Sequence, residues 1–592
     1  MCGFSGAVDF SGAPASAAAV EAMTQRLAAR GPDAFGMSCH QHVALGHRRL
    51  KIIDLSDRSR QPLVDPELGL VVAFNGCIYN YRELRAELEA HGHRFFSAGD
   101  TEVIAKAWKT WGRDCVARFK GMFAFAVHDI ERGSVALARD RLGIKPLYVI
   151  DDGACKQIRF ASTLPALLAV DGVDTTLDPI ALHHYLSFHS VVPAPRTIFA
   201  GVRKVPPATV IEYARDGTRR EHCYWSLDFG DAVADRVVTE EEGQAMTEQL
   251  LRQAVQRRMV ADVPVGVLLS GGLDSSLIVG LLAEAGQRDL HTFSIGFDDV
   301  GGERGNEFEY SDIVARHFDT THTRLHIDSG QVLERLPDAI AAMSEPMVSH
   351  DNIAFFLLSE QVKQQVDVVQ SGQGADEVFA GYHWYPHLMQ RDQALEAYRD
   401  VFFDRDHDAM REVLEVGWLG QDHSSAFVAD HFAKPGAGSA LDKALRLDIQ
   451  IMLADDPVKR VDNMTMAAGL EARVPFLDHE LVELAARLPA RMKLADGGKG
   501  VLKRIARQII PHAVIDRPKG YFPVPALKYL EGDFLARIGD VLTGRRARER
   551  GIVRQDYVAK LLAAPGDHIT PLGGSKLWQL GLLELWLQEQ GV

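Results

Sequence analysis

The chain begins Met1-Cys2-Gly3, an arrangement that would suit an N-terminal nucleophile. Initiator methionine is commonly removed before a small side chain, and its removal would leave Cys2 with a free α-amine. An α-amine has a pKa of about 7.7–8.0, so it can accept the thiol proton near neutral pH. The alternative is an ordinary cysteine at a frayed chain end, and the dipeptide alone does not exclude it.

Three further segments carry groups suited to hydrolysing the amide of a small amino acid. Arg49 adjoins an apolar strand and could clamp a carboxylate with two hydrogen bonds. Asn75 and Gly76 are expected to end a strand in a tight turn, where a side-chain amide and a backbone N–H could form an oxyanion hole. Asp100 opens a helix and could hold a substrate ammonium. Singly, these are a surface arginine, a hairpin turn and a helix N-cap. With Cys2 they form a complete site for a zwitterionic amide.

A second chemical motif lies at Ser270-Gly271-Gly272-Leu273-Asp274-Ser275-Ser276, directly after an apolar run. Its small residues let backbone N–H groups approach an anion, and a helix expected to begin after Ser276 would direct its positive end at the same anion. Asp274 is placed to ligate a metal ion that bridges phosphate oxygens. The motif lacks the Gly-Lys-Ser/Thr ending of a Walker loop, which disfavours γ-phosphoryl transfer. The alternative is a glycine-rich strand–helix turn.

A related segment, Ser371-Gly372-Gln373-Gly374, again follows a buried strand, and Asp376 comes directly after it. Asp376 could therefore pair with Asp274 on Mg²⁺. The predicted chemistry is adenylation, in which a carboxylate attacks the α-phosphorus of ATP and pyrophosphate leaves. The charge on that leaving group requires Mg²⁺ and nearby cations.

The elements that must position these groups differ between the two halves. The first ~200 residues combine strands with a few helices, including a helical pattern after Asn80. In the second half, apolar runs at 263–269, 292–297 and 366–369 alternate with helical patterns, which predicts a parallel α/β sheet. Beyond residue ~395 the pattern is almost entirely helical. Pro206-Pro207 and the charged stretch 228–242 place the boundary within 205–240.

Composition excludes several classes of protein. The 592 residues carry a formal charge of −15, which argues against a nucleic-acid partner, and the basic tract Arg545–Arg550 predicts a solvated helix face. The sequence has no apolar run near the ~18 residues of a membrane helix and no export signal, so we predict no membrane partner and a cytoplasmic location. The six cysteines form no CxxC pair, which disfavours disulfide or cysteine–zinc frameworks. All except Cys2 are predicted to be buried thiols.

Residues 2–200 resemble the class II glutamine amidotransferases, notably in the segments 30–33, 74–80 and 138–148. The resemblance implies an N-terminal-nucleophile (Ntn) hydrolase domain with four αββα layers. It implies that Cys2 attacks the glutamine carboxamide and that Asn75 and Gly76 stabilise the oxyanion. Arg49 would bind the α-carboxylate and Asp100 the α-ammonium. One departure is Cys77, where relatives usually carry glutamate, so an acidic contact to glutamine is missing or supplied elsewhere.

The second half resembles ATP pyrophosphatases, and both halves together resemble the glutamine-hydrolysing asparagine synthetases. The resemblance implies a glutaminase domain at 2–205 and, at 240–592, an α/β ATP-pyrophosphatase domain of the adenine nucleotide α hydrolase type with a helical C-terminal region. It implies an enclosed ammonia passage and a homodimer. Lys519 would be a catalytic cation beside the phosphates, and ATP would contact the following residues: Leu269, Ser270, Gly271, Gly272, Asp274, Ser275, Ser276, Ser294, Ser371, Gly372, Gln373 and Lys519.

The carboxylate acceptor is less certain from the sequence than the reaction. Asparagine synthetases usually have glutamate where this chain has Gln373, and a carboxamide cannot take a proton from the incoming amine. A neutral, nearly isosteric exchange is one explanation, and an altered acceptor site is the other. Cys77 and Gln373 together resemble the branch of N-acetylglutaminylglutamine amidotransferases, which amidate a dipeptide α-carboxylate to make an osmoprotectant. Aspartate is the alternative acceptor.

Two other functional classes are weaker. A pure hydrolase would use only the first domain and leave the intact Ser-Gly-Gly-Leu-Asp-Ser-Ser motif without a role. A non-catalytic binding or regulatory protein would be expected to lose the nucleophile or the motif aspartate, and both Cys2 and Asp274 are present. The sequence therefore predicts an ATP-dependent amidotransferase.

Overall fold

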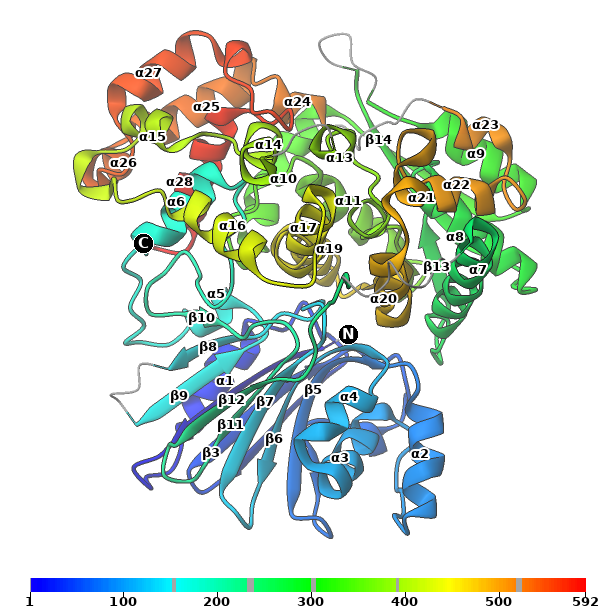
Figure 1. Cartoon of the computed structure of the whole chain (residues 1–592). Helices are drawn as coiled ribbons and strands as arrows, with labels where there is room; N and C mark the ends of the chain where they lie inside the picture. Colours follow the sequence, from blue (N-terminus) through cyan, green and yellow to red (C-terminus); the bar gives the residue numbers. More distant parts are fainter. Residues whose placement is uncertain (1, 152–155, 231–238, 300–304, 390–392, 518–523) are drawn as a thin grey trace.

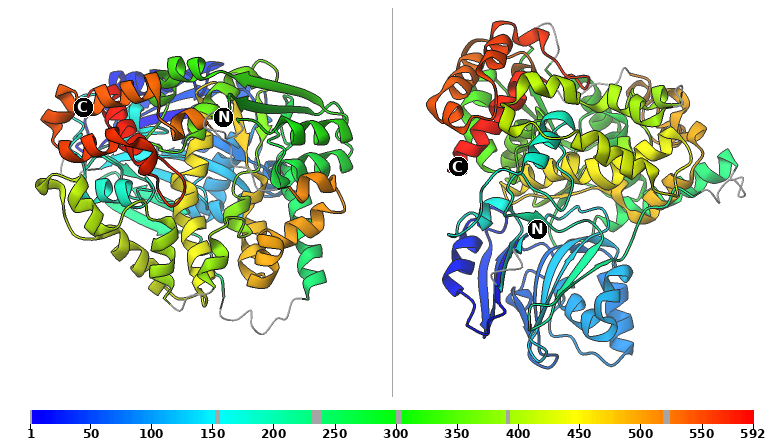
Figure 2. Two further views of the ribbon diagram at one scale, coloured as in Figure 1. Left: turned by 90° about the horizontal axis from the view of Figure 1, so that it is seen from above. Right: turned by 60° about the vertical axis from the view of Figure 1, so that its left-hand side comes forward.

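The computed structural model describes residues 2–151, 156–230, 239–299, 305–389, 393–517 and 524–592. In this part of the chain, the N-terminal half contains two six-stranded antiparallel sheets, and the C-terminal half contains a five-stranded parallel sheet surrounded by helices (Figure 1). The two halves pack directly against each other, as the side view also shows (Figure 2).

The two N-terminal sheets lie face to face. The first has the order β10-β8-β9-β1-β3-β2, with strands Arg203–Lys204, Tyr148–Asp151, Gln157–Ala161, Gly3–Asp9, Val43–Arg49 and Ala34–His40. The second has the order β12-β11-β7-β6-β5-β4, with strands Arg219–Cys223, Thr209–Tyr213, Ser134–Arg139, Gly121–Asp129, Leu70–Ile78 and Leu63–Asp65.

Strand β5 shows how the two sheets and the helices that cover them form four layers. Successive side chains of a strand point to opposite faces. Val71 and Ala73 pack between the sheets, whereas Val72 and Phe74 pack on the outer face against α2 (Tyr81–Ala90) and α3 (Asp100–Trp111). On the far side, α1 (Ala17–Gln25) and α5 (Leu164–Leu167) cover the first sheet. The predicted αββα order is confirmed.

The N-terminal unit continues past residue 205, where the glutaminase domain was expected to end. Strand β11 pairs with β7 in register Val210↔Ala138, and β12 pairs with β11. Both strands therefore belong to the second sheet, and the structural unit extends at least to Cys223. Cys223 lies within the boundary region 205–240 expected from the sequence, although Pro206-Pro207 precedes two further strands instead of ending the sheet.

The parallel sheet of the second half has the order β15-β14-β13-β16-β17, with strands Thr321–Ile327, His291–Phe297, Val265–Leu268, Val368–Gln370 and Glu471–Arg473. The three predicted apolar runs supply β13, β14 and β16. Helices α8 (Leu273–Glu284) and α7 (Glu240–Arg257) lie over one face, and α11 (Asp351–Val362) and α10 (Ser329–Ala341) over the other. Burial on both faces explains why these strands are continuously apolar.

Residues beyond 393 are mainly helical, and β17 is the one named strand there among the described residues. The main helices are α14 (Ala394–Phe402), α15 (His407–Val413), α16 (His423–Ala433), α17 (Ala440–Leu447), α19 (Pro457–Met466), α20 (His479–Arg487), α22 (Gly500–Ala506), α25 (Gly532–Thr543), α26 (Arg545–Arg550), α27 (Gln555–Ala563) and α28 (Lys576–Glu589). The predicted basic helix, α26, has no buried residue.

Two cysteines differ from expectation. Cys39 and Cys223 are exposed, whereas Cys77 and Cys115 are buried as predicted, and Cys155 lies outside the described residues. Cys39 lies on β2, an edge strand of the first sheet, and Cys223 ends β12, an edge strand of the second, so neither is enclosed by neighbouring strands. Across the described segments, no helix is long and apolar enough to cross a membrane.

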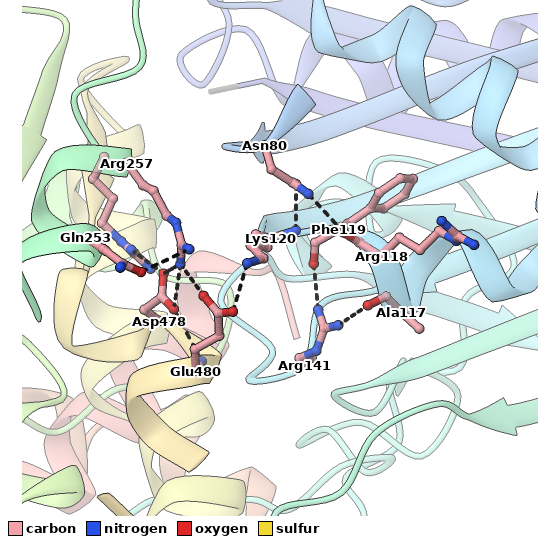
Figure 3. Close-up of polar contacts among 11 residues, drawn as sticks. Asn80, Ala117, Arg118, Phe119, Lys120, Arg141, Gln253, Arg257, Asp478 and Glu480 are labelled. Carbon is pink, nitrogen blue, oxygen red and sulfur yellow. Dashed lines mark hydrogen bonds and ion pairs between the residues drawn. The ribbon is translucent and has the colours of Figure 1, made fainter. Parts of the chain in front are cut away.

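Charged side chains join the two halves at the periphery of their contact (Figure 3). Lys120, just before β6, lies 2.8 Å from Glu480 at the start of α20. Within the second half, Arg257 at the end of α7 contacts the same Glu480 and also Asp478. Deeper in the interface, Asp462 of α19 pairs with two N-terminal cations, Arg30 and Lys145, each at 2.9 Å.

Candidate active sites

Cys2 lies in a narrow pocket between the ends of the two N-terminal sheets. It precedes β1, whose first residue Gly3 pairs with Arg48 of β3, so this pairing brings Cys2 beside Arg49. The pocket brings together four predicted residues, Cys2, Arg49, Gly76 and Asp100. It is also lined by Leu50, Ile52, Ile53, Ser59, Gln61, Phe74, Cys77, Gly99, Thr101, Glu471 and Arg473.

Asn75 and Gly76 lie at the Cys2 pocket, although they do not form the expected tight turn. Strand β5 continues to Ile78, and Asn75 and Gly76 pair with Ala124 and Phe123 of β6. Asn75 Oδ1 accepts a hydrogen bond from Cys2 N at 3.2 Å. Within the described chain, Asn75 Nδ2 is buried without a partner. This unpaired donor lies beside Cys2, and a donor of this kind can stabilise an oxyanion.

Position 76 requires a glycine, because the neighbouring strand β6 lies too close to leave room for a side chain. The φ of Gly76, 152°, is one that L side chains rarely adopt, and a Cβ there would lie 2.1 Å from the carbonyl oxygen of Met122. Glycine therefore keeps β5 and β6 paired at this position while leaving its backbone beside the pocket.

Arg49 and Asp100 face the same pocket from different elements. The Arg49 guanidinium donates to the carbonyl oxygen of Ser56 at 2.9 Å and to that of Asp54. Asp100 is the first residue of α3 and accepts a hydrogen bond from Ile78 N at 3.1 Å. Gly99, not Asp100, is the N-cap. Burial raises the pKa of Asp100 to about 6, against the opposing hydrogen bond from Ile78.

Burial also raises the pKa of the Cys2 thiol, although the amino-terminal charge and Arg49 oppose the shift. A protonated thiol is a weak nucleophile, so the site needs a proton acceptor close to Cys2. Arg30 donates a hydrogen bond to the Cys2 carbonyl oxygen at 3.4 Å and also pairs with Asp462 of the other half. The Cys2 backbone is therefore linked, through Arg30, to the C-terminal half.

The C-terminal half contributes two charged residues to this pocket that the sequence did not predict. Glu471 and Arg473 of β17 lie 2.5 Å apart (Oε1 to Nε) and line the wall beside Cys77. Burial opposes ionisation of Glu471, but Arg473 outweighs it and lowers the pKa of Glu471 to about 2. Cys77 is a neutral thiol there, because burial raises its pKa. An acidic side chain is therefore present although the usual glutamate is not.

The glycine-rich motif forms a tight loop between β13 and α8. Helix α8 begins at Leu273 with Gly272 as N-cap, so Asp274, Ser275 and Ser276 form its first turn, one turn earlier than expected. Ser275 Oγ accepts a hydrogen bond from Ser270 N at 3.2 Å, which closes the loop. Gly271 has φ 74°, and a Cβ there would lie 2.6 Å from Ser311 N.

Asp274 and Asp376 converge as predicted, and a buried lysine lies between them. Lys499 Nζ is 2.6 Å from Asp274 Oδ2 and 2.9 Å from Asp376 Oδ2. Burial disfavours its charge, but the two carboxylates outweigh burial and raise the pKa of Lys499. Lys499 precedes α22 and has a left-handed backbone conformation (φ 56°). The surrounding segment, Gly-Gly-Lys-Gly, has no local sequence pattern that would have identified Lys499 as a site residue.

These groups line a cavity of about 790 Å³ at the carboxyl ends of the parallel strands. This is where open α/β sheets bind ligands. Ten predicted residues line it: Leu269, Ser270, Gly272, Asp274, Ser275, Ser294, Ser371, Gly372, Gln373 and Asp376. Gly271 and the fully buried Ser276 are not among the lining residues. Lys519 lies outside the described residues, so its predicted role has no structural counterpart here.

Three further polar residues on the cavity wall escaped the sequence prediction. Arg517 pairs with Glu307 at 2.8 Å, and Arg460 lies 3.3 Å from Asp351. His189 Nδ1 lies 3.0 Å from Asp404 Oδ1. His189 has φ 49°, an uncommon conformation for a non-glycine residue. Only the fold brings it to the cavity, because it follows α6 (Pro179–Ser187), far from the glycine-rich motif in sequence.

Hydrogen-bonded neighbours at the β16–β17 ladder line the pocket on one side and the cavity on the other. Arg473 of β17 lines the Cys2 pocket, and its carbonyl oxygen accepts a hydrogen bond from Ser371 N at 2.8 Å. Ser371 in turn lines the large cavity. Adjacent residues of one sheet therefore border both sites.

Comparison with known families agrees with this two-part arrangement. The asparagine synthase family model matches residues 246–588, and the glutamine amidotransferase domain model matches residues 1–225. Asparagine synthetase [glutamine-hydrolyzing] 1 of Bacillus subtilis (strain 168) is 30% identical over 99% of this chain and 96% of its own. Asparagine synthetase [glutamine-hydrolyzing] 3 of the same strain is 30% identical over 88% and 87%.

A solved structure, glutamine phosphoribosylpyrophosphate amidotransferase from B. subtilis complexed with ADP and GMP, is more distant. It is 15% identical with a TM-score of 0.30, covering 56% of this chain and 92% of that chain. This likeness is too weak to support an inference.

The two-part arrangement, with a pocket at Cys2 and a cavity at the glycine-rich loop, and the two family matches together define a glutamine-dependent ligase. The chain belongs to the asparagine synthase family and carries an N-terminal glutamine amidotransferase domain. It is a glutamine-hydrolysing amidotransferase that forms a carbon–nitrogen bond, and its family uses ATP as a substrate.

Proposed function

We propose that this enzyme adenylates a carboxylate and amidates it with ammonia from glutamine, releasing AMP and pyrophosphate. The observation that carries the proposal is the convergence of Asp274, Asp376 and Lys499 with Gln373 in one cavity that adjoins the Cys2 pocket. The acceptor oxygen would bond to the α-phosphorus as pyrophosphate leaves. Ammonia would then bond to the acyl carbon as AMP leaves, with one proton lost to a base.

In the first site, Cys2 would attack the glutamine carboxamide carbon and the α-amine freed by loss of Met1 would accept the thiol proton. Asn75 Nδ2 and Gly76 N would donate to the oxyanion. Arg49 would bind the α-carboxylate and Asp100 the α-ammonium, because both line the pocket. We assign Glu471 to the acidic contact that Cys77 cannot make.

In the second site, Asp274 and Asp376 would hold Mg²⁺. Carboxylate oxygens are preferred ligands of this ion, and both aspartates already approach one cation, the Lys499 ammonium. Bound Mg²⁺ supplies neutralisation of the pyrophosphate charge. Lys499 would contribute a second positive charge at the same place, the role that the sequence prediction gave to Lys519.

Ammonia would pass from the first site to the second along the β16–β17 ladder. The hydrogen bond between Ser371 and Arg473 supports this route, because each residue lines one of the two cavities. A short enclosed route would keep ammonia from becoming ammonium in bulk water, where it is not nucleophilic.

The acceptor that we propose is the α-carboxylate of an N-acylated dipeptide such as N-acetylglutaminylglutamine. Two observations support it: Gln373 stands where a carboxylate is usual, and the cavity of about 790 Å³ offers room beyond a nucleotide for an extended molecule. Gln373 cannot accept a proton, and we assign that step to His189, which Asp404 orients at the cavity wall. Aspartate is the second candidate, because the relatives described above are named for asparagine synthesis.

The test is glutamine-dependent pyrophosphate release with the dipeptide, aspartate and other carboxylates as acceptors. We expect pyrophosphate with the dipeptide, together with equimolar AMP. Turnover with aspartate alone would overturn the acceptor assignment but keep the reaction. Release of inorganic phosphate in place of pyrophosphate would overturn adenylation itself.

A further inference from the structure

A cluster of imidazoles lies away from both active sites, where α6 packs on α15 and α16. His183 lies on α6, His407 begins α15, and Asp422 is the N-cap of α16. One ligand atom from each of these three residues lies within 4.8 Å of the others. His183 Nε2 and His407 Nδ1 are 3.2 Å apart. Figure 1 shows α6 beside α16, and His183 lies more than two hundred positions before His407 and Asp422 in the chain.

The spacing of these atoms matches a small transition-metal ion. Zinc binds imidazole nitrogen and carboxylate oxygen at about 2.0–2.2 Å, which places tetrahedral ligand atoms about 3.4 Å from one another. The two imidazole nitrogens are already at that spacing. The Asp422 oxygen completes a group of three ligand atoms that all lie within 4.8 Å of one another, and His407 and Asp422 are half-buried.

The ligands are held by the hydrogen bonds that metal-binding side chains usually have. His183 Nδ1 lies 3.0 Å from Ser424 Oγ, which leaves Nε2 to face His407. Ser424 Oγ also contacts Ser187 Oγ at 2.6 Å. Asp422 accepts a hydrogen bond from Ser425 N at 3.0 Å through one oxygen, and this bond fixes the carboxylate at the helix end.

His183 is almost fully buried, with only 2% of its surface exposed.

We propose that His183 Nε2, His407 Nδ1 and the Asp422 carboxylate form a zinc-class divalent metal site, distinct from the Mg²⁺ site at Asp274 and Asp376. Two imidazoles and one carboxylate suit Zn²⁺ better than Mg²⁺, which prefers oxygen ligands. Solvent or the neighbouring His423, whose ring centroid is 5.7 Å from that of His183, would complete the coordination.

The position of the site indicates a structural role for the metal ion. Helix α6 leads directly to His189 at the wall of the large cavity, and α15 follows Asp404, the partner of His189. A metal ion that ties α6 to α15 would fix the two chain segments that carry this pair. The site joins α6, which lies between β9 and β10 of the N-terminal half, to two helices of the synthetase half.

The test measures Zn²⁺ binding to the full chain in the Cys2→Ala background, with excess Mg²⁺ to saturate oxygen-only sites. Competition with a chromophoric chelator gives the affinity, and bound metal is counted by elemental analysis after dialysis. We expect a zinc site that His407→Ala weakens at least about 100-fold, since it removes one of three protein ligands. His91→Ala, an exposed histidine near Trp111, is the matched control and should bind as the parent does.

Two further measurements separate this site from the exposed cysteines. Co²⁺ bound in place of Zn²⁺ should show no thiolate charge-transfer band, and Asp422→Asn should also weaken binding. Asp422→Asn keeps a residue type that caps helices well, so folding is retained. Ammonia-dependent synthesis and circular dichroism verify that each variant is folded. No binding at micromolar Zn²⁺, or equal affinity in His407→Ala and its parent, would overturn the proposal.

Discussion

The two candidate active sites are built differently. The Cys2 pocket is narrow, and its predicted residues all lie within the first hundred positions. The large cavity takes its lining from segments spread between residues 189 and 573, and several of its charged groups pair with one another. A small substrate with fixed ends can be held by a few side chains of one domain. A nucleotide, a metal ion and an acceptor together need a larger cavity. The charged side chains of such a cavity can neutralise one another until the substrates bind.

Cys2→Ala should have the largest effect and should break the first site alone. Without the thiol, no covalent intermediate forms, so glutamine-dependent synthesis should fall at least about 1000-fold. Synthesis from high ammonia should persist, because the second cavity is unchanged. Both activities are measured as pyrophosphate release. Loss of the ammonia-dependent activity as well would show that the two sites are not separable.

Asn75→Ala should have the next largest effect, also confined to the first site. It removes the buried donor Nδ2 and the contact to Cys2 N, and loss of one oxyanion-hole donor costs about 100- to 1000-fold in kcat. Glutaminase kcat and KM should be measured separately. A change in KM with normal kcat would assign Asn75 to substrate binding instead.

Asp274→Asn should break the second site and spare the first. The amide is a poor ligand for Mg²⁺ and a weaker partner for Lys499, so ATP cleavage should fall at least about 100-fold. Glutaminase activity without ATP should remain. Asp289→Asn changes an exposed aspartate of the same half and serves as the control. Normal ATP turnover in Asp274→Asn would remove Asp274 from the metal site.

The pH dependence of glutamine binding should sharpen the assignment of Asp100. Its pKa is raised to about 6, so the carboxylate is present above that pH and is lost as the pH falls through it. The KM for glutamine should therefore rise about 10-fold between pH 7 and pH 5. Asp100→Asn should have a high KM with no such dependence. A flat KM in the parent enzyme would assign the ammonium contact elsewhere.

The smallest effect should come from the peripheral ion pair between the halves. Lys120 and Glu480 are each about one-third exposed, so Lys120→Ala should lower the free energy of unfolding by less than about 1 kcal/mol. Asp462→Asn removes the charge that compensates the buried Arg30 and Lys145, and it should cost several times more. Urea unfolding of both variants tests the difference. Equal losses would show that burial does not decide the strength of these contacts.

Local sequence patterns predicted the class of the fold correctly and suggested the chemistry of both sites. Cys2, Asn75-Gly76 and the Ser-Gly-Gly-Leu-Asp-Ser-Ser loop are short segments whose residue types can be read without the fold. Continuous apolar runs predicted β13, β14 and β16, because strands covered on both faces need no polar alternation. The continuation of β5 beyond Asn75-Gly76 was missed, because pairing with β6 overrides the turn preference of that dipeptide.

Only the tertiary structure decided which distant residues complete each site. Lys499 reaches Asp274 and Asp376 across more than a hundred positions, and Glu471 with Arg473 closes a pocket that belongs to the other half. The His183–His407–Asp422 cluster arises in the same way. A sequence pattern reports the local backbone and the face of an element. Distances between side chains on different elements depend on packing, which no local pattern contains.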